Sequence, residues 1–123
     1  TLEMAPKSPV AHSGLGWMYE KQGKFKEAMD EQRKALKTYP GYSRARYRLA
    51  AALYKSGDDK AAEKEFKKAI ETKPLDPNSM VEYGLFLQKK GRKEEARSQY
   101  QAVLKLLPNN QLAKEAMKSL NDG

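Results

Sequence analysis

The sequence predicts an all-α fold, a row of three helical hairpins closed by a C-terminal helix, and three observations support this prediction. Proline recurs at a spacing of 34 residues along the 123-residue chain, and glycine and alanine recur on the same spacing. Apolar residues lie three and four apart on both sides of each recurring glycine, as on one face of a helix. Such a period is typical of stacked units that bury their apolar faces only against neighbours. The recurring residues are Pro6, Pro40, Pro74 and Pro108, then Gly23, Gly57 and Gly91, then Ala28, Ala62 and Ala96.

The period divides the chain into units 9–42, 43–76 and 77–110, each predicted to be two antiparallel helices joined at a glycine turn. In the first unit, Ser8 is a helix N-cap followed by Pro9 at the first helical position. Gly23 ends that helix, and the second helix is expected over about residues 25–38.

The later units carry the same start signals. Asp58 is expected to cap the second helix of the middle unit, and Asp76 precedes Pro77 at the start of the third. Residues 111–123 are predicted to form a capping helix, with Leu112, Ala116 and Leu120 on its buried side.

Small residues are expected where the helices of a hairpin approach closely, and large apolar residues between them. The small positions are Gly16, Ala50 and Gly84, opposite the recurring alanines. The large core groups are expected to be Leu15, Tyr19, Leu49, Leu53, Phe66, Tyr83, Leu87 and Tyr100.

Composition excludes several classes of site. The chain has no cysteine and one histidine, His12, so thiolate chemistry is absent and a metal or cofactor site lacks ligands. The carboxylates Glu82, Glu94 and Glu95 are expected at outer or turn positions without a base or nucleophile, so the sequence predicts a non-enzyme without cofactors. No apolar stretch of about 18 to 20 residues predicts membrane insertion.

The pattern of these units resembles the tetratricopeptide repeat family over residues 9–110. That resemblance implies a right-handed superhelical solenoid without catalytic activity, whose concave wall is formed by the first helix of each unit. His12 stands where the pattern has tryptophan, and Gln32, Leu53 and Leu87 stand where it has aromatic residues. The matching residues are His12, Leu15, Gly16, Tyr19, Ala28 and Pro40, then Leu49, Ala50, Ala62, Phe66, Ala69 and Pro74, then Gly84, Ala96, Tyr100 and Pro108.

The family geometry implies which side chains face the concave groove. Exposed aromatic and cationic residues dominate binding energy when a partner covers them. Arg44 and Arg48 lie four apart and could hold a carboxylate together. The residues expected to bind a partner are Trp17, Lys21, Arg44, Tyr47, Arg48, Tyr54, Lys55, Asn78, Val81, Leu85 and Lys89, with Val10, Ser13, Ala51 and Gln88 also expected to face the groove.

The leading functional hypothesis is a scaffold or adaptor module that holds an extended or helical peptide of a partner. A net charge of +8, from 24 basic and 16 acidic residues, favours an acidic peptide. One alternative is a chaperone-tail co-chaperone, because Arg44 and Arg48 resemble the basic half of the family's carboxylate clamp, although Gly14 stands at the clamp's other position.

Two further hypotheses concern other surfaces. Residues 1–8 read as the tail of a preceding repeat, so the chain is expected to be a fragment of a longer repeat protein. The edge at residues 1–9 would then favour homo-oligomers that stack through their repeat edges. The positive charge is spread along the chain, so only non-specific nucleic-acid binding is expected. The sequence favours the cytoplasm and leaves the periplasm open.

Overall fold

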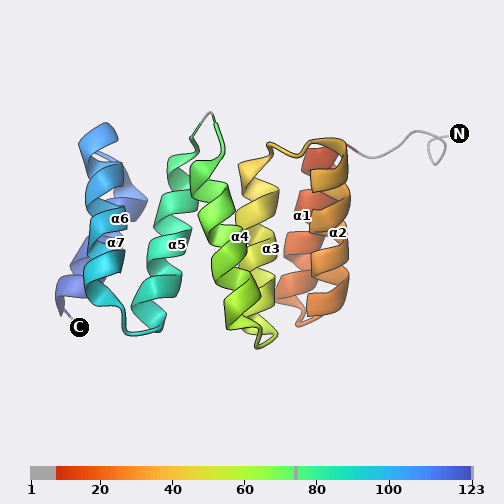
Figure 1. The fold of residues 1–123 in the computed structure, drawn as a ribbon, viewed down its shortest axis with the longest axis horizontal. Helices are drawn as coiled ribbons and strands as arrows, with labels where there is room; N and C mark the ends of the chain where they lie inside the picture. Colours follow the sequence, from red (N-terminus) through yellow and green to blue (C-terminus); the bar gives the residue numbers. More distant parts are fainter. Residues whose placement is uncertain (1–7, 74, 123) are drawn as a thin grey trace, which may run out of the picture.

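The fold is a row of α-helices that pack as antiparallel hairpins. The structure is a computed structural model that describes residues 8–73 and 75–122. Within these residues every regular element is a helix, and the helices lie side by side from α1 and α2 at one end to α6 and α7 at the other (Figure 1). The predicted all-α solenoid is confirmed. The helices are α1 (Pro9–Lys21), α2 (Phe25–Thr38), α3 (Ser43–Lys55), α4 (Asp59–Glu71), α5 (Pro77–Lys89), α6 (Lys93–Leu106) and α7 (Gln111–Asp122).

Polar side chains fix the starts of three helices, as predicted. Ser8, Asp58 and Asp76 each accept a hydrogen bond from a backbone N–H of the first helical turn, which otherwise has no partner. The turn glycines inside the hairpins all have positive φ, a region that side chains disfavour. The cap distances are 3.1 Å from Ala11 N, 3.2 Å from Ala61 N and 2.9 Å from Asn78 N.

The predicted close approach of paired helices is confirmed at Gly84. A Cβ atom added there would lie 2.4 Å from Cε1 of Tyr100, so only glycine lets α5 and α6 pack around that ring. Gly16 is equally restricted, because its added Cβ would lie 2.9 Å from the Ala28 carbonyl oxygen. In the first and third hairpins, a glycine therefore lets the two helices pack closely, against the Ala28 backbone in one and around the Tyr100 ring in the other.

Most of the predicted core is buried, with a systematic exception in the first hairpin. The six large groups from the second and third hairpins are all buried, whereas Leu15 and Tyr19 are only partly buried. α1 and α2 form one end of the described row, so only α3 covers them from the side (Figure 1). The buried six are Leu49, Leu53, Phe66, Tyr83, Leu87 and Tyr100.

The first hairpin is joined by polar groups instead. His12 Nδ1 lies 2.8 Å from Glu31 Oε1, and Gln32 donates from Nε2 to the Ser13 carbonyl oxygen at 2.9 Å. Burial acts to raise the pKa of Glu31, but hydrogen bonds from His12 and Lys34 outweigh it and leave the pKa lowered. His12 thus ties α1 to α2.

The two ends of the chain differ from the sequence prediction or fall outside the described residues. In α7 the buried residues are Ala113, Ala116 and Leu120, whereas Leu112 is 53% exposed, so its predicted burial is wrong. The reason is the phase of the helix: Ala113, Ala116 and Leu120 are spaced three and four residues apart and share one face, whereas successive steps of four residues drift around the helix and leave Leu112 at the edge of that face. At the other end, the expected repeat tail and stacking edge fall almost wholly on residues 1–7, which lie outside the described residues, as does Pro74.

Candidate functional site

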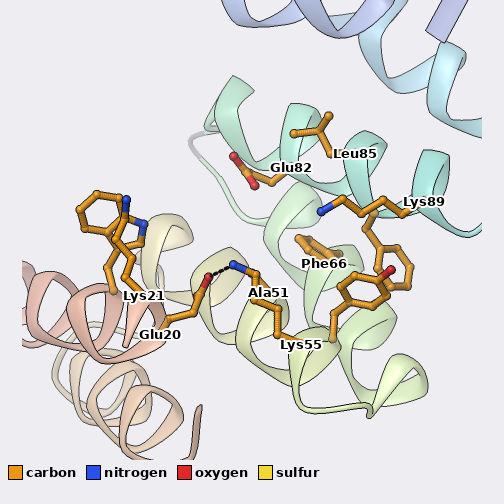
Figure 2. A pocket seen from close by; sticks show the side chains of 11 residues that line it. Glu20, Lys21, Ala51, Lys55, Phe66, Glu82, Leu85 and Lys89 are labelled. Carbon is orange, nitrogen blue, oxygen red and sulfur yellow. Dashed lines mark hydrogen bonds and ion pairs between the residues drawn. The ribbon is translucent and has the colours of Figure 1, made fainter. Parts of the chain in front are cut away.

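A cavity of about 350 Å³ opens where α1, α3 and α5 meet along one wall of the solenoid. α3 contacts both α1 and α5, so side chains from three hairpins converge there. Figure 2 shows them around the opening, with Glu20 and Lys55 on one side and Glu82, Leu85 and Lys89 on the other. The lining residues are Trp17, Glu20, Lys21, Ala51, Tyr54, Lys55, Phe66, Glu82, Leu85, Phe86 and Lys89.

Six of the residues expected to bind a partner line this cavity. They come from α1, α3 and α5, the helices expected to form the concave wall. Their convergence identifies one place where a single ligand could touch all three hairpins. These residues are Trp17, Lys21, Tyr54, Lys55, Leu85 and Lys89.

Other predicted binding residues do not line the cavity. Tyr47 is 9% exposed and Val81 is 2% exposed, and both belong to the hydrophobic core, so their predicted exposure in the groove is wrong. Ser13, also expected in the groove, is fully buried. The physical reason is that neighbouring hairpins close over the edges of each first helix. Arg44, Arg48 and Asn78 keep some exposure but lie outside the cavity lining.

Four lining residues were missed from the sequence: Glu20, Phe66, Glu82 and Phe86. The expectation that Glu82 lies on an outer or turn position is wrong. Glu82, Leu85 and Lys89 are spaced three and four apart on α5, which places them on one face, so the helical spacing could have revealed it. Phe66 gave no such signal, because it reaches the cavity from the second helix of its hairpin.

A cluster of aromatic rings packs at the cavity, in which Tyr54 is partly exposed whereas Phe66 and Phe86 are almost fully buried. The Tyr54 and Phe86 rings meet edge to face, with centroids 5.3 Å apart. The Phe66 and Phe86 centroids lie 5.2 Å apart. Such contacts are favourable beyond the area they bury. The apolar part of the site is therefore a packed surface that exists before any ligand binds.

Charged side chains form the remainder of the lining. Lys55 pairs with Glu20 at 2.7 Å, which joins α3 to α1. Lys21 lies over the Trp17 ring at 4.1 Å, and the Lys89 ammonium lies 5.9 Å from the centre of the Tyr54 ring. Cations over aromatic faces are attracted by the ring quadrupole, which places negative potential on the face of the ring. Lys21 and Lys89 make no ion pair within the described residues.

Arg48 is held by the neighbouring hairpin. Its Nη1 lies 3.3 Å from the Ser13 carbonyl oxygen and 3.2 Å from Ser13 Oγ, and it donates to that residue. Its guanidinium lies 5.5 Å from the centre of the Trp17 ring. Burial lowers the pKa of Arg48. By contrast, Arg44 is exposed and forms no hydrogen bond or ion pair with another described residue, so the two arginines are not equivalent.

Sequence comparison assigns the repeats. One sequence model described as tetratricopeptide repeat matches residues 21–79, and a second with the same description matches residues 77–110. The chain belongs to the tetratricopeptide repeat family. No curated protein matches the sequence of this tetratricopeptide repeat chain.

Solved tetratricopeptide domains share the fold. The first TPR domain of human RPAP3 is 24% identical with a TM-score of 0.80, over 96% of this chain and 93% of that one. The first TPR of Spaghetti (RPAP3), bound to the HSP90 peptide SRMEEVD, is 24% identical with a TM-score of 0.75, over 94% and 91%. The Arabidopsis OM64 TPR domain is 22% identical with a TM-score of 0.76, over 94% and 95%. At these identities the likeness shows the fold alone.

Metal-ligand clusters and membrane-spanning helices are both absent from the described residues of this tetratricopeptide array. Among the residues that the structure describes, no group of three or more acidic, histidine or cysteine side chains could hold a metal ion. In the same residues, no helix has the length and apolar character needed to cross a bilayer.

Proposed function

We propose that this chain is a protein-interaction scaffold that holds an acidic peptide of a partner protein against α1, α3 and α5. The observation that carries the proposal is the cavity, where apolar rings are bordered by cations without acidic partners. Lys21 on α1 and Lys89 on α5 line the cavity, and Arg44 lies on α3, between those two helices. None of these three cations forms an ion pair within the described part of the chain. A peptide carboxylate would supply the missing partner.

A structural neighbour supports this class of ligand. The first TPR of Spaghetti is bound to an HSP90 peptide whose sequence, SRMEEVD, ends in acidic residues around one valine. In the chain described here, Arg48 already donates to Ser13, so Arg44 is the arginine with its donors free. The proposed ligand is therefore an acidic peptide, and a chaperone tail is one member of that class. We assign binding to the cavity and no catalytic step.

Charge reversal on the cavity side tests the proposal. We expect Lys21→Glu, Arg44→Glu and Lys89→Glu, combined in one variant, to weaken binding of a labelled glutamate-rich nonapeptide by at least about tenfold. The reason is that three attractive charges become repulsive, whereas the core is untouched. Fluorescence anisotropy measures the dissociation constants.

The matched control reverses Lys26, Lys37 and Lys64, which are exposed on the second helices α2 and α4. This control changes the net charge of the protein by the same amount. This variant is expected to lose much less affinity, because its charges lie away from the cavity. Equal losses in both variants would show that only overall charge attracts the peptide, and the proposed site would be wrong.

A further inference from the structure

The carboxylate of Glu82 faces the cavity without a partner. It lies on α5 and points toward the opening (Figure 2). No described residue donates a hydrogen bond to it or forms an ion pair with it, although it is half-buried. Burial, followed by the negative charge of Glu20, raises the pKa of Glu82, and Lys89 is the first of the cations that oppose this. A ligand that brings a hydrogen-bond donor would remove the free-energy cost of leaving this desolvated acceptor unpaired.

The charges already in the cavity limit which donor fits. Three lysines, Lys21, Lys55 and Lys89, line it against two carboxylates, so a further ammonium or guanidinium group would add to an existing positive excess. A second carboxylate would be repelled beside Glu82. The group that suits Glu82 is therefore an uncharged donor.

The shape and surface of the cavity favour a flat ring. Its volume of about 350 Å³ is near the lower end of the range for ligand pockets, which suits a single large side chain. The partly exposed Tyr54 ring offers aromatic surface and is backed by the buried rings of Phe86 and Phe66, and aromatic pairs favour stacked or edge-to-face contacts. An apolar ring with one polar end combines both requirements, and tyrosine and tryptophan have this structure.

We propose that the cavity is an anchor subsite for a tyrosine or tryptophan of the partner peptide, whose O–H or N–H donates a hydrogen bond to Glu82. This inference rests on the proposed function and adds the identity of the anchoring side chain. The ring packs against Tyr54, which the buried Phe86 ring supports edge to face. Acidic residues on either side of it reach the cations Lys21, Lys89 and Arg44. Glu82 is then a specificity residue that separates tyrosine from phenylalanine.

The test compares nonapeptides with four glutamates on each side of a central tyrosine, phenylalanine, lysine or glycine. Trp17 is the sole tryptophan of the chain and lines the cavity, so its fluorescence reports occupancy directly. For the unmodified protein we expect the tyrosine peptide to bind about tenfold more tightly than the phenylalanine peptide, since hydrogen bonds to charged groups are among the stronger ones. In Glu82→Leu the two peptides should differ by less than about twofold.

Each of the other possible results would contradict either the role of Glu82, the anchor subsite or the proposed function. Equal binding of the tyrosine and phenylalanine peptides to the unmodified protein would overturn the role of Glu82 and leave the acidic-peptide groove standing. This comparison needs no variant, so it holds even if Glu82→Leu folds poorly. Tightest binding of the lysine peptide would show a cation site instead. Equal binding of the glycine peptide would show that the cavity is not an anchor. Absence of binding by all four peptides would overturn the proposed function as well.

Discussion

Replacing Tyr100 by alanine is expected to lower the free energy of unfolding by about 3–5 kcal/mol. Tyr100 lies on α6 with its side chain 0% exposed, and its ring fills the space that Gly84 leaves on α5. Its hydroxyl donates to Gln88 Oε1 at 2.9 Å. The substitution therefore leaves a cavity between two helices and removes a hydrogen bond. Urea denaturation followed by circular dichroism measures the change.

The control for this prediction is Tyr39→Ala. Tyr39 follows α2, is 52% exposed and stacks only on Tyr42 among described rings, so its loss should cost less than about 1 kcal/mol. A cost of less than about 1 kcal/mol for Tyr100→Ala as well would contradict the packing described for α5 and α6.

Replacing Arg48 by methionine is expected to destabilise the protein by about 1.5–3 kcal/mol. Arg48 on α3 donates to both the carbonyl oxygen and the hydroxyl of Ser13 on α1, and it covers the Trp17 ring. Methionine keeps the length of the side chain but leaves the fully buried Ser13 without these bonds. The same denaturation experiment measures the loss.

Arg44→Met is the matched control, since Arg44 lies one turn earlier on α3 and is exposed. Its substitution should change stability by no more than about 0.5 kcal/mol. Equal effects of the two substitutions would contradict the distinction between an arginine that joins hairpins and one that is free to meet a ligand. The double variant with Arg48→Met and Ser13→Ala should lose less stability than the sum of the losses in the two single variants, because both substitutions remove the same interaction.

The sequence predicts the helices and their ends well because those features are local. Ser8, Asp58 and Asp76 cap helices by accepting from N–H groups two or three residues away. The turn glycines are needed by backbone conformation alone. In α7, Ala116 and Leu120 are buried as predicted, and the third buried residue is Ala113 rather than the more apolar Leu112, because spacings of three and four residues keep to one face whereas two successive steps of four do not.

The site was less predictable because burial on a solenoid depends on the neighbouring hairpin. Tyr47 and Val81 lie on the correct helices, yet adjacent side chains cover them. Phe66 belongs to a second helix and still reaches the cavity. Glu82 resembles a solvent-exposed carboxylate in sequence, although it shares a face of α5 with Leu85 and Lys89, and the packing of α3 against both α1 and α5 brings it into the cavity with Trp17.

We propose that a partner peptide binds in the cavity formed by α1, α3 and α5. The most direct test of this binding is an NMR titration, in which isotopically nitrogen-labelled protein is mixed with the glutamate-rich peptide that carries a central tyrosine. The amide chemical shifts are followed during the titration. We expect the largest chemical-shift changes around Trp17, Tyr54 and Leu85, with little change at the exposed faces of α2 and α4. Changes centred on those second helices, or no saturable change anywhere, would contradict binding in this cavity.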